Sequence, residues 1–283
     1  MDESIKQFYQ DFYDCIGISE ESSNVIEKLK KEYFADKIKN ETLYKFIAFD
    51  DKTNLNFQKI NALKNKQLWF GAYYVFEDGT EMQVKADYER ISKETGCGYK
   101  IAELYVNFQR ELKDICCLTT SISEEMWNRY ANNHSGICLV FKIKSYSFMY
   151  PVIYTQKSNI DYTDSIISVF KSLKHSPSQL YLNKELRRIS FEPIVLKNSV
   201  DYDYENEVRL LCGDSYDNIF GPHGERLFKT QKKNIAYKGC YYTYDYVKLE
   251  LSKVIVGQNL DKEILDEIIS IANEQNVQLI YEK

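Results

Sequence analysis

Charged side chains alternate along the segment DYDYENEVRLLCG, residues 201–213, and define the first candidate site. Glu205, Glu207 and Arg209 are two residues apart, so on a strand they point to one face while Val208 points to the other. Two interpretations are open at this point. The charges form either a solvated strand face with paired Glu and Arg side chains, or a site in which one carboxylate reacts while Arg209 orients it or binds an anion.

The segment TLYKFIAF, residues 42–49, carries a cation that a carboxylate site could use. It reads as a strand with Tyr44 and Lys45 on opposite faces. A lysine in this place either lies at a sheet edge facing water or meets a phosphate. The aromatic segment QLWFGAYYV, residues 67–75, reads as the next strand, and Trp69 on it either packs in the core or stacks on a nucleobase.

Aromatic residues at helical spacing mark the segment SISEEMWNRYANNHSGICLVF, residues 121–141. Trp127 and Tyr130 are three apart and share a helix face, and His134 follows one turn beyond Tyr130. Gly136 ends the helix before an apolar strand. The aromatic face either anchors the helix on that strand or forms the wall of a cleft, with His134 at the helix end facing it.

Composition and spacing exclude several other classes. The net charge is −5, which argues against general coating of nucleic acid. The three histidines have no metal-binding spacing, so we expect no metal site. The seven cysteines form no CxxC pair, which argues against a disulfide framework and for a reducing compartment. No signal peptide and no membrane-spanning run is found, so we expect a cytoplasmic protein that does not contact the membrane.

The elements that must position these residues predict an α+β fold. We expect an N-terminal helical extension over residues 1–40 and a single α+β domain over 41–283, with a mixed, partly antiparallel sheet flanked by helices. The last segments read as strand, amphipathic helix and strand, a unit that pairs in parallel through a right-handed crossover. Further strands are expected at residues 137–141, 151–154, 205–212 and 246–256.

The order of these motifs resembles the bacterial family labelled domain of unknown function 2971. The resemblance spans residues 42–283, and its specific parts are the MWNRYANNHSGICLVF block and the YENEVRL block. The sequence departs from the family at residues 76–81, where FEDGTE replaces the usual Asn-Asp-Pro turn, and near Tyr202, where the family has Trp. The resemblance implies an effector or toxin of mobile elements and anti-phage systems.

The layout is also similar, more distantly, to ADP-ribosyltransferase folds, and this likeness implies NAD as the cofactor. Cleavage of the nicotinamide–ribose bond builds positive charge that a carboxylate stabilises. The likeness implies Glu207 as the catalytic carboxylate, with Glu205 second, and a nucleotide-type ligand with a protein or nucleic acid as a possible target. The likeness places Tyr44 and Lys45, with Trp69 or Tyr130, at the cofactor. The patterns described above add His134 and Arg209 to the expected cofactor-binding residues.

A rival hypothesis makes the protein a sensing module for nucleic acid or a small ligand. Basic clusters at residues 186–188 and 229–233, with Lys197 and Arg209, would then grip a phosphate backbone. A nuclease variant of this hypothesis would use Glu205, Glu207 and a third acid with a divalent metal. If residues 121–141 wall a site, we expect one pocket to gather Lys45, Tyr130, His134, Glu207 and Arg209.

Overall fold

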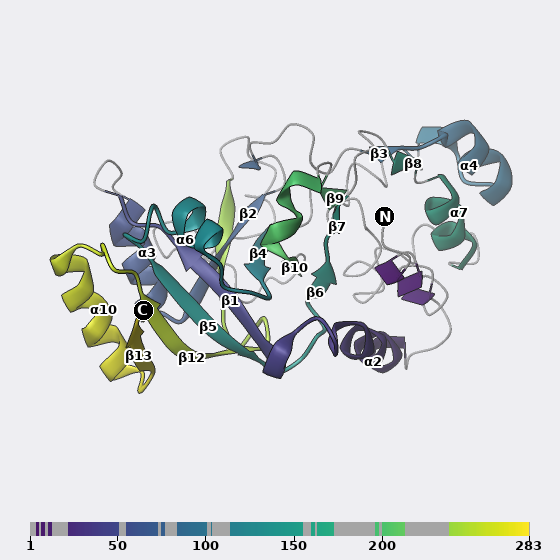
Figure 1. Ribbon diagram of the computed structural model, residues 1–283. Helices are drawn as coiled ribbons and strands as arrows, with labels where there is room; N and C mark the ends of the chain where they lie inside the picture. The colour runs from purple at the N-terminus through teal and green to yellow at the C-terminus, as the bar shows by residue number, and fades with distance from the viewer. Residues whose placement is uncertain are drawn as a thin grey trace.

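The fold combines one mixed, largely antiparallel sheet with flanking helices, which confirms the predicted α+β class (Figure 1). The computed structural model describes residues 4–5, 7–8, 11–12, 22–50, 55–72, 75–76, 84–100, 103, 114–154, 160–161, 163–172, 196–197, 200–212 and 238–282. The basic clusters at 186–188 and 229–233 lie outside these residues, as do residues 77–81 of the FEDGTE turn. Among the residues described, no helix has the length and apolar composition needed to cross a bilayer.

The main sheet has the strand order β11-β2-β4-β1-β5-β12-β13, and β10 and β6 extend it beyond the other edge of β4. Only the β12–β13 pair in this sheet is parallel, joined through helix α10, which confirms the predicted strand–helix–strand unit. The strands are β1 (Thr42–Ile47), β2 (Gln67–Ala72), β4 (Asp114–Thr119), β5 (Ile137–Ile143), β6 (Met149–Pro151), β10 (Glu207–Cys212), β11 (Gly239–Thr243), β12 (Leu249–Val256) and β13 (Gln278–Tyr281).

Strand β4 lies at the branch point of this sheet. It pairs along its whole length with β10. It also pairs with β2 at its first residues, Asp114 and Ile115, and with β1 at its last, Thr119. Since β1 and β2 join β4 at opposite ends, they do not pair with each other. Trp69 on β2 therefore does not lie on a strand that pairs with β1.

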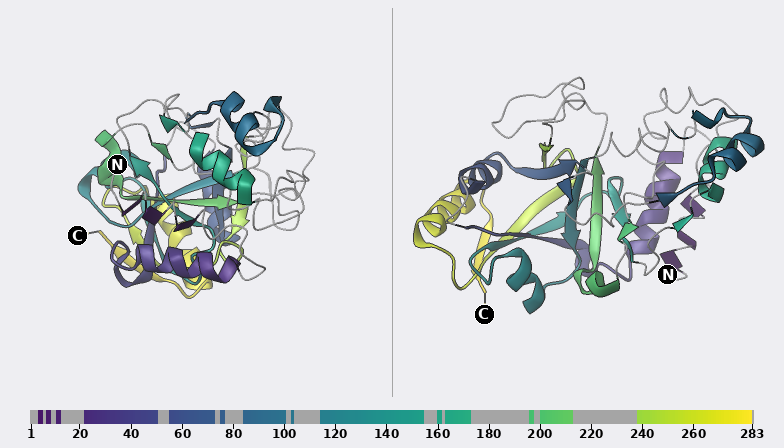
Figure 2. Two further views of the ribbon diagram at one scale, coloured as in Figure 1. Left: turned by 90° about the vertical axis from the view of Figure 1, so that its right-hand side faces the viewer. Right: turned by 90° about the horizontal axis from the view of Figure 1, so that it is seen from above.

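Helices cover the sheet and form the two ends of an elongated molecule (Figure 2). Helices α3 and α10 pack together at one end, where Lys64 pairs with Glu267 at 2.8 Å, and α4 and α7 pair at the other through Arg90 and Asp164. The helices are α2 (Ser22–Phe34), α3 (Leu55–Lys64), α4 (Tyr88–Thr95), α6 (Glu124–Tyr130), α7 (Thr163–Ser172) and α10 (Lys262–Glu274), with 3₁₀ turns η1 (Lys39–Glu41) and η4 (Val200–Glu205).

Two short parallel pairs lie outside the main sheet. Strand β3 (Val84–Lys85) pairs with β8 (Ile160–Asp161), and β7 (Ile153–Tyr154) pairs with β9 (Leu196–Lys197). The second pair matters for the site, because β9 brings a lysine to the start of β10. The N-terminal helix α2 packs on the main core through Phe34.

The sequence patterns do not predict two strands of the main sheet. These are β4, formed by the segment DICCLT, and β11. The strand expected at 205–212 begins two residues later. Glu205 ends the 3₁₀ turn η4, and Asn206 has a positive φ of 43°, so the chain turns sharply between the two glutamates.

Candidate functional site

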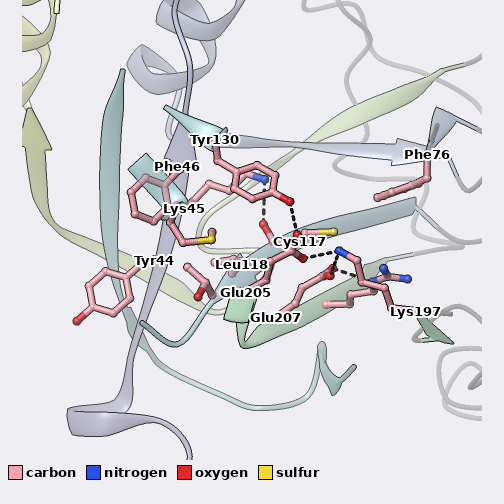
Figure 3. A pocket seen from close by; sticks show the side chains of 13 residues that line it. Tyr44, Lys45, Phe46, Phe76, Cys117, Leu118, Tyr130, Lys197, Glu205 and Glu207 are labelled. Atoms are coloured by element: carbon pink, nitrogen blue, oxygen red, sulfur yellow. Dashed lines mark hydrogen bonds and ion pairs between the residues drawn. The ribbon is translucent and has the colours of Figure 1, made fainter. Parts of the chain in front are cut away.

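The central residues of the site surround a cavity of about 200 Å³, which we call the carboxylate pocket (Figure 3). Its walls come from β1, β4, α6, β9 and β10, so it forms where the branch strand β4 meets the start of β10. Segments from all over the chain contribute to it. The lining residues are Tyr44, Lys45, Phe46, Phe76, Cys117, Leu118, Thr119, Met126, Tyr130, Lys197, Glu205, Glu207 and Arg209.

Glu207 is held between two cations although its side chain is almost fully buried. Its Oε1 accepts from Arg209 Nε at 2.8 Å, and its Oε2 accepts from Lys197 Nζ at 3.4 Å. The backbone N–H of Glu207 donates to the Tyr154 hydroxyl at 2.9 Å. Arg209 is only 1 % exposed. The interpretation of these charges as a solvated strand face is therefore wrong.

Glu205 lies beside Glu207 and shares one of its cations. Lys197 Nζ donates to Glu205 Oε2, and the Tyr130 hydroxyl donates to Glu205 Oε1. Lys197 Nζ also lies over the Tyr202 ring, 4.7 Å from its centroid. One lysine thus bridges two carboxylates, and a tyrosine on α6 closes the network on the other side.

The charges of this network set the ionisation of its members. Burial acts to raise the pKa of Glu207, but the charges of Arg209 and Lys197 outweigh it and lower the pKa to about 2. Burial, together with the hydrogen bond to Glu205, raises the pKa of Tyr130. Burial and the negative charge of Glu207 raise the pKa of the Cys117 thiol well above its ordinary value. Near neutral pH the pocket therefore holds an ionised carboxylate beside a neutral phenol and a neutral thiol.

The β1 side of the pocket supplies a third cation and an apolar wall. Lys45 Nζ donates to the backbone carbonyl of Cys117 at 2.9 Å. Phe46 packs edge-on against Trp127, with ring centroids 5.0 Å apart. The ring of Tyr44 lines the pocket but points away from the carboxylates (Figure 3).

Six of the eight predicted site residues line this one pocket, and two do not. The six are Tyr44, Lys45, Tyr130, Glu205, Glu207 and Arg209. Trp69 lies on β2 in a neighbouring cavity, where its ring meets Tyr241 edge-on. The helix of residues 121–141 thus both packs on the core, through Trp127, and walls a site, through Met126 and Tyr130.

His134 is the second predicted residue that lies elsewhere, so the expected convergence is wrong for this residue. Helix α6 ends at Tyr130, and Asn132, Asn133 and His134 all have positive φ angles of 50°, 52° and 63°. Because this left-handed turn replaces the helix, the one-turn spacing from Tyr130 no longer applies. The His134 ring instead stacks on Trp127, away from the carboxylate pocket.

His134 lies between two carboxylates, and one ligand atom from each of the three side chains lies within 4.8 Å of the others. Its Nδ1 lies 2.8 Å from Glu282 and its Nε2 lies 3.0 Å from Glu124. The hydrogen bond to Glu282, with the weaker one to Glu124, raises the pKa of His134. A protonated His134 ring donates to both carboxylates through its two nitrogens. The geometry is that of an ion-pair clamp.

The nuclease hypothesis needs a third acid beside Glu205 and Glu207. Of the described residues that line the carboxylate pocket, only these two are acidic, and Lys197 and Arg209 occupy their oxygens. Cations in those positions repel a divalent metal. The donor set does not fit a two-carboxylate metal centre.

Lys197 is the main pocket residue that sequence reasoning assigned to a different role. It was expected only as a phosphate-gripping residue of a sensing module, yet its side chain pairs with both glutamates. Its strand β9 has two residues, too short for a periodic pattern to predict it. The apolar run in DICCLT, by contrast, is a signal that could have placed Cys117 on a buried strand.

Comparison with known protein families gives one match. Residues 126–210 match the family described as Protein of unknown function (DUF2971). This supports the resemblance to that family. The DUF2971 segment begins in α6 and ends in β10, so it contains Tyr130, Lys197, Glu205, Glu207 and Arg209 but not Lys45. No curated protein and no solved structure matches the chain, so the likeness to ADP-ribosyltransferases gains no support from these comparisons.

Proposed function

We propose that the protein is an NAD-consuming enzyme that breaks the nicotinamide–ribose bond at the carboxylate pocket. The observation that carries this proposal is the buried Glu207 carboxylate, kept ionised by Arg209 and Lys197. A fixed negative charge in a largely buried site stabilises a developing oxocarbenium ion more strongly than the same charge in water. The likeness that suggested NAD rests on the sequence motifs alone.

The proposed chemistry needs no metal. The C1′–N bond breaks, its electron pair leaves with neutral nicotinamide, and the cationic sugar is stabilised by Glu207. A water molecule, or a nucleophile on a target macromolecule, then forms the new bond to C1′ and releases its proton to the solvent. With its pKa near 2, Glu207 acts through charge and is a poor base. We therefore assign it to electrostatic stabilisation and not to proton transfer.

Lys45 and Tyr130 have supporting roles in this proposal. Lys45 enters from β1 and supplies positive charge for a phosphate, while the exposed edge of Tyr130, whose hydroxyl holds Glu205, lies at the pocket. At about 200 Å³, the carboxylate pocket accommodates the sugar and the bond to be broken, and not a whole dinucleotide. The rest of the ligand must lie outside it.

The test is release of nicotinamide from NAD by the purified protein, alone and with candidate protein or nucleic-acid targets. We expect turnover by the wild type and a loss of at least about 100-fold in Glu207→Asp, which keeps the charge but withdraws it from the sugar. Glu207→Gln is expected to lose activity as well, but it leaves Arg209 and Lys197 with an uncompensated charge and is less stable. Glu250→Gln, at an exposed ion pair, is the matched control.

A binding module is the second candidate, and one observation favours it. All four carboxylate oxygens of Glu205 and Glu207 already accept hydrogen bonds, from Tyr130, Lys197 and Arg209. Such a closed network also suits a purely structural role. NAD binding without release of nicotinamide would select the module over the enzyme. Equal turnover in Glu207→Asp and wild type would instead contradict the role of Glu207 in the reaction.

We further propose a cellular role as a cytoplasmic toxin or defence effector. Expression of the wild type would then lower cellular NAD and stop growth, and Glu207→Asp would abolish both effects at equal protein level. Growth arrest with unchanged NAD in the wild type would contradict the NAD-consuming role.

A further inference from the structure

A second and larger cavity lies where β1 and β2 separate. We call it the fork cavity. It has a volume of about 610 Å³, within the range of sites for small organic ligands. Helix α3 forms one wall, and β1, β2 and β11 form the others. Its lining includes Phe46, Trp69, Tyr241 and three lysines, Lys45, Lys59 and Lys238.

The fork cavity exists because two strand edges face each other without pairing. In the described part of the chain, residues 45–47 of β1 pair only with β5, and residues 67–70 of β2 pair only with β11. Both strands meet β4, but at opposite ends. The backbone groups along this opening must find other partners.

Two of the lysines that line the fork cavity bond to backbone carbonyls next to these two edges. Lys45 Nζ donates to the carbonyl of Cys117 on β4 at 2.9 Å, and Lys59 Nζ donates to the carbonyl of Ala48, just after β1, at 2.7 Å. Charges that point into a strand edge oppose the addition of another strand. The fork is therefore poorly suited to an extended peptide and better suited to a small ligand.

The positive charge of the residues that line the fork cavity favours an anionic ligand. Of the described residues that line the fork cavity, three are lysines and none is Asp or Glu. Burial lowers the pKa of Lys59, partly offset by Asp50, so this cation is costly and gains from a counter-ion. An ammonium has three N–H donors, so a bond to one carbonyl leaves it able to bind a phosphate or carboxylate.

The aromatic side chains on one wall of the fork cavity favour a ligand with a planar ring. Trp69 and Tyr241 lie on paired neighbouring strands with ring centroids 4.9 Å apart, and Tyr241 is buried. Together with Phe46 and with Leu55, Ala62 and Leu63 of α3, they offer a surface on which a planar ring packs well. A lining of this kind binds poorly to inorganic anions alone.

We infer that the fork cavity binds a planar aromatic ring joined to phosphate, with the ring against Trp69 and Tyr241 and the phosphate on Lys45 and Lys59. Lys45 and Phe46 line both cavities, so such a ligand extends toward Glu207. The inference rests on the proposed function only in identifying this ligand as the nucleotide end of NAD. Binding itself requires no reaction at the carboxylate pocket.

The test is calorimetric binding of ADP, which has the ring and the phosphates but no nicotinamide–ribose bond. We expect ADP to bind, with adenosine and pyrophosphate each at least tenfold weaker. Lys59→Met and Tyr241→Leu should each weaken ADP binding about tenfold or more. The matched controls are Lys64→Met and Phe57→Leu, on the exposed side of the same helix α3, and thermal melting verifies that each variant is folded.

The outcomes separate this inference from the proposed function. ADP binding that depends on Lys59 and Tyr241, without any turnover of NAD, supports the fork site and overturns the enzyme. If turnover of NAD is unchanged in Lys59→Met and Tyr241→Leu, the proposed ligand site in the fork cavity is overturned, while the proposed NAD-consuming activity stands. Absence of ADP binding to the wild type, or binding of pyrophosphate as tight as that of ADP, also overturns the inference.

Discussion

Glu207 keeps its negative charge although its side chain is buried, and the cost is offset by the two cations that flank it. An isolated buried carboxylate would take up a proton instead. Arg209 is two residues away on the same strand, but Lys197 arrives from β9. Removing one partner of such a group leaves an unbalanced buried charge, which costs more than the pair contributes.

This arrangement predicts a loss of stability in acid. The folded pKa of Glu207 is about 2, below the unfolded value, so its contribution is fully present above about pH 4.5 and is lost as the pH falls toward 2. This difference between the folded and unfolded pKa of Glu207 corresponds to roughly 3 kcal/mol in the free energy of unfolding. We expect urea unfolding between pH 5 and pH 2.5 to show a smaller pH dependence in Glu207→Gln than in wild type. Parallel curves would contradict the assigned ionisation.

The turn after α6 shows how an element boundary moves a side chain to a different site. Three successive residues, Asn132 to His134, take positive φ angles, and the backbone carbonyl of His134 accepts from Asn259 at 2.9 Å. An added Cβ at Gly257 would lie 2.2 Å from that same carbonyl oxygen. The turn therefore docks on the segment after β12 and directs His134 toward the C-terminal strand.

The ion pairs of His134 predict a dependence of stability on pH that is opposite in sign to that of Glu207. Its folded pKa is raised by Glu282, so the contribution is present below about pH 6.5 and is lost as the pH rises through the folded pKa. Glu282, the main cause of this shift, is 11 % exposed, whereas Glu124 is 76 % exposed and contributes little to the free energy of unfolding. His134→Asn, which tolerates the positive φ, should lower the melting temperature more at pH 6 than at pH 9. An equal decrease at both pH values would contradict the ion-pair interpretation.

Local sequence patterns predict elements better than they predict which elements meet. The motif ENEVRL placed Glu207 and Arg209 on one strand, but their burial depends on β4 and β6, which flank β10 on both sides. The position of Trp69 depends on where β2 joins β4, which no residue of β2 reveals. For His134 a signal was available, because asparagine is the residue that most readily takes a positive φ after glycine, and two precede it.

At the scale of the whole molecule, the site depends on segments spread along the described chain. The DUF2971 segment contributes the carboxylates and Lys197, while β1 contributes Lys45 and β2 and β11 contribute the aromatic wall of the fork cavity. Helix α2 packs on the same core, where Lys30 is fully buried and donates to the Ser147 carbonyl at 2.7 Å. The division into residues 1–40 and 41–283 stays a prediction.

The central claim is that one molecule of the dinucleotide NAD spans the two cavities, with its reactive sugar at Glu207. The most direct measurement is a crystal structure with an NAD analogue whose ribose ring oxygen is replaced by carbon, which cannot form the oxocarbenium ion. We predict the nicotinamide-bearing ring beside the Glu207 carboxylate, a phosphate on Lys45, and the adenine against Trp69 and Tyr241. An analogue bound elsewhere, or no bound analogue at a concentration that saturates the protein with NAD, would contradict the account.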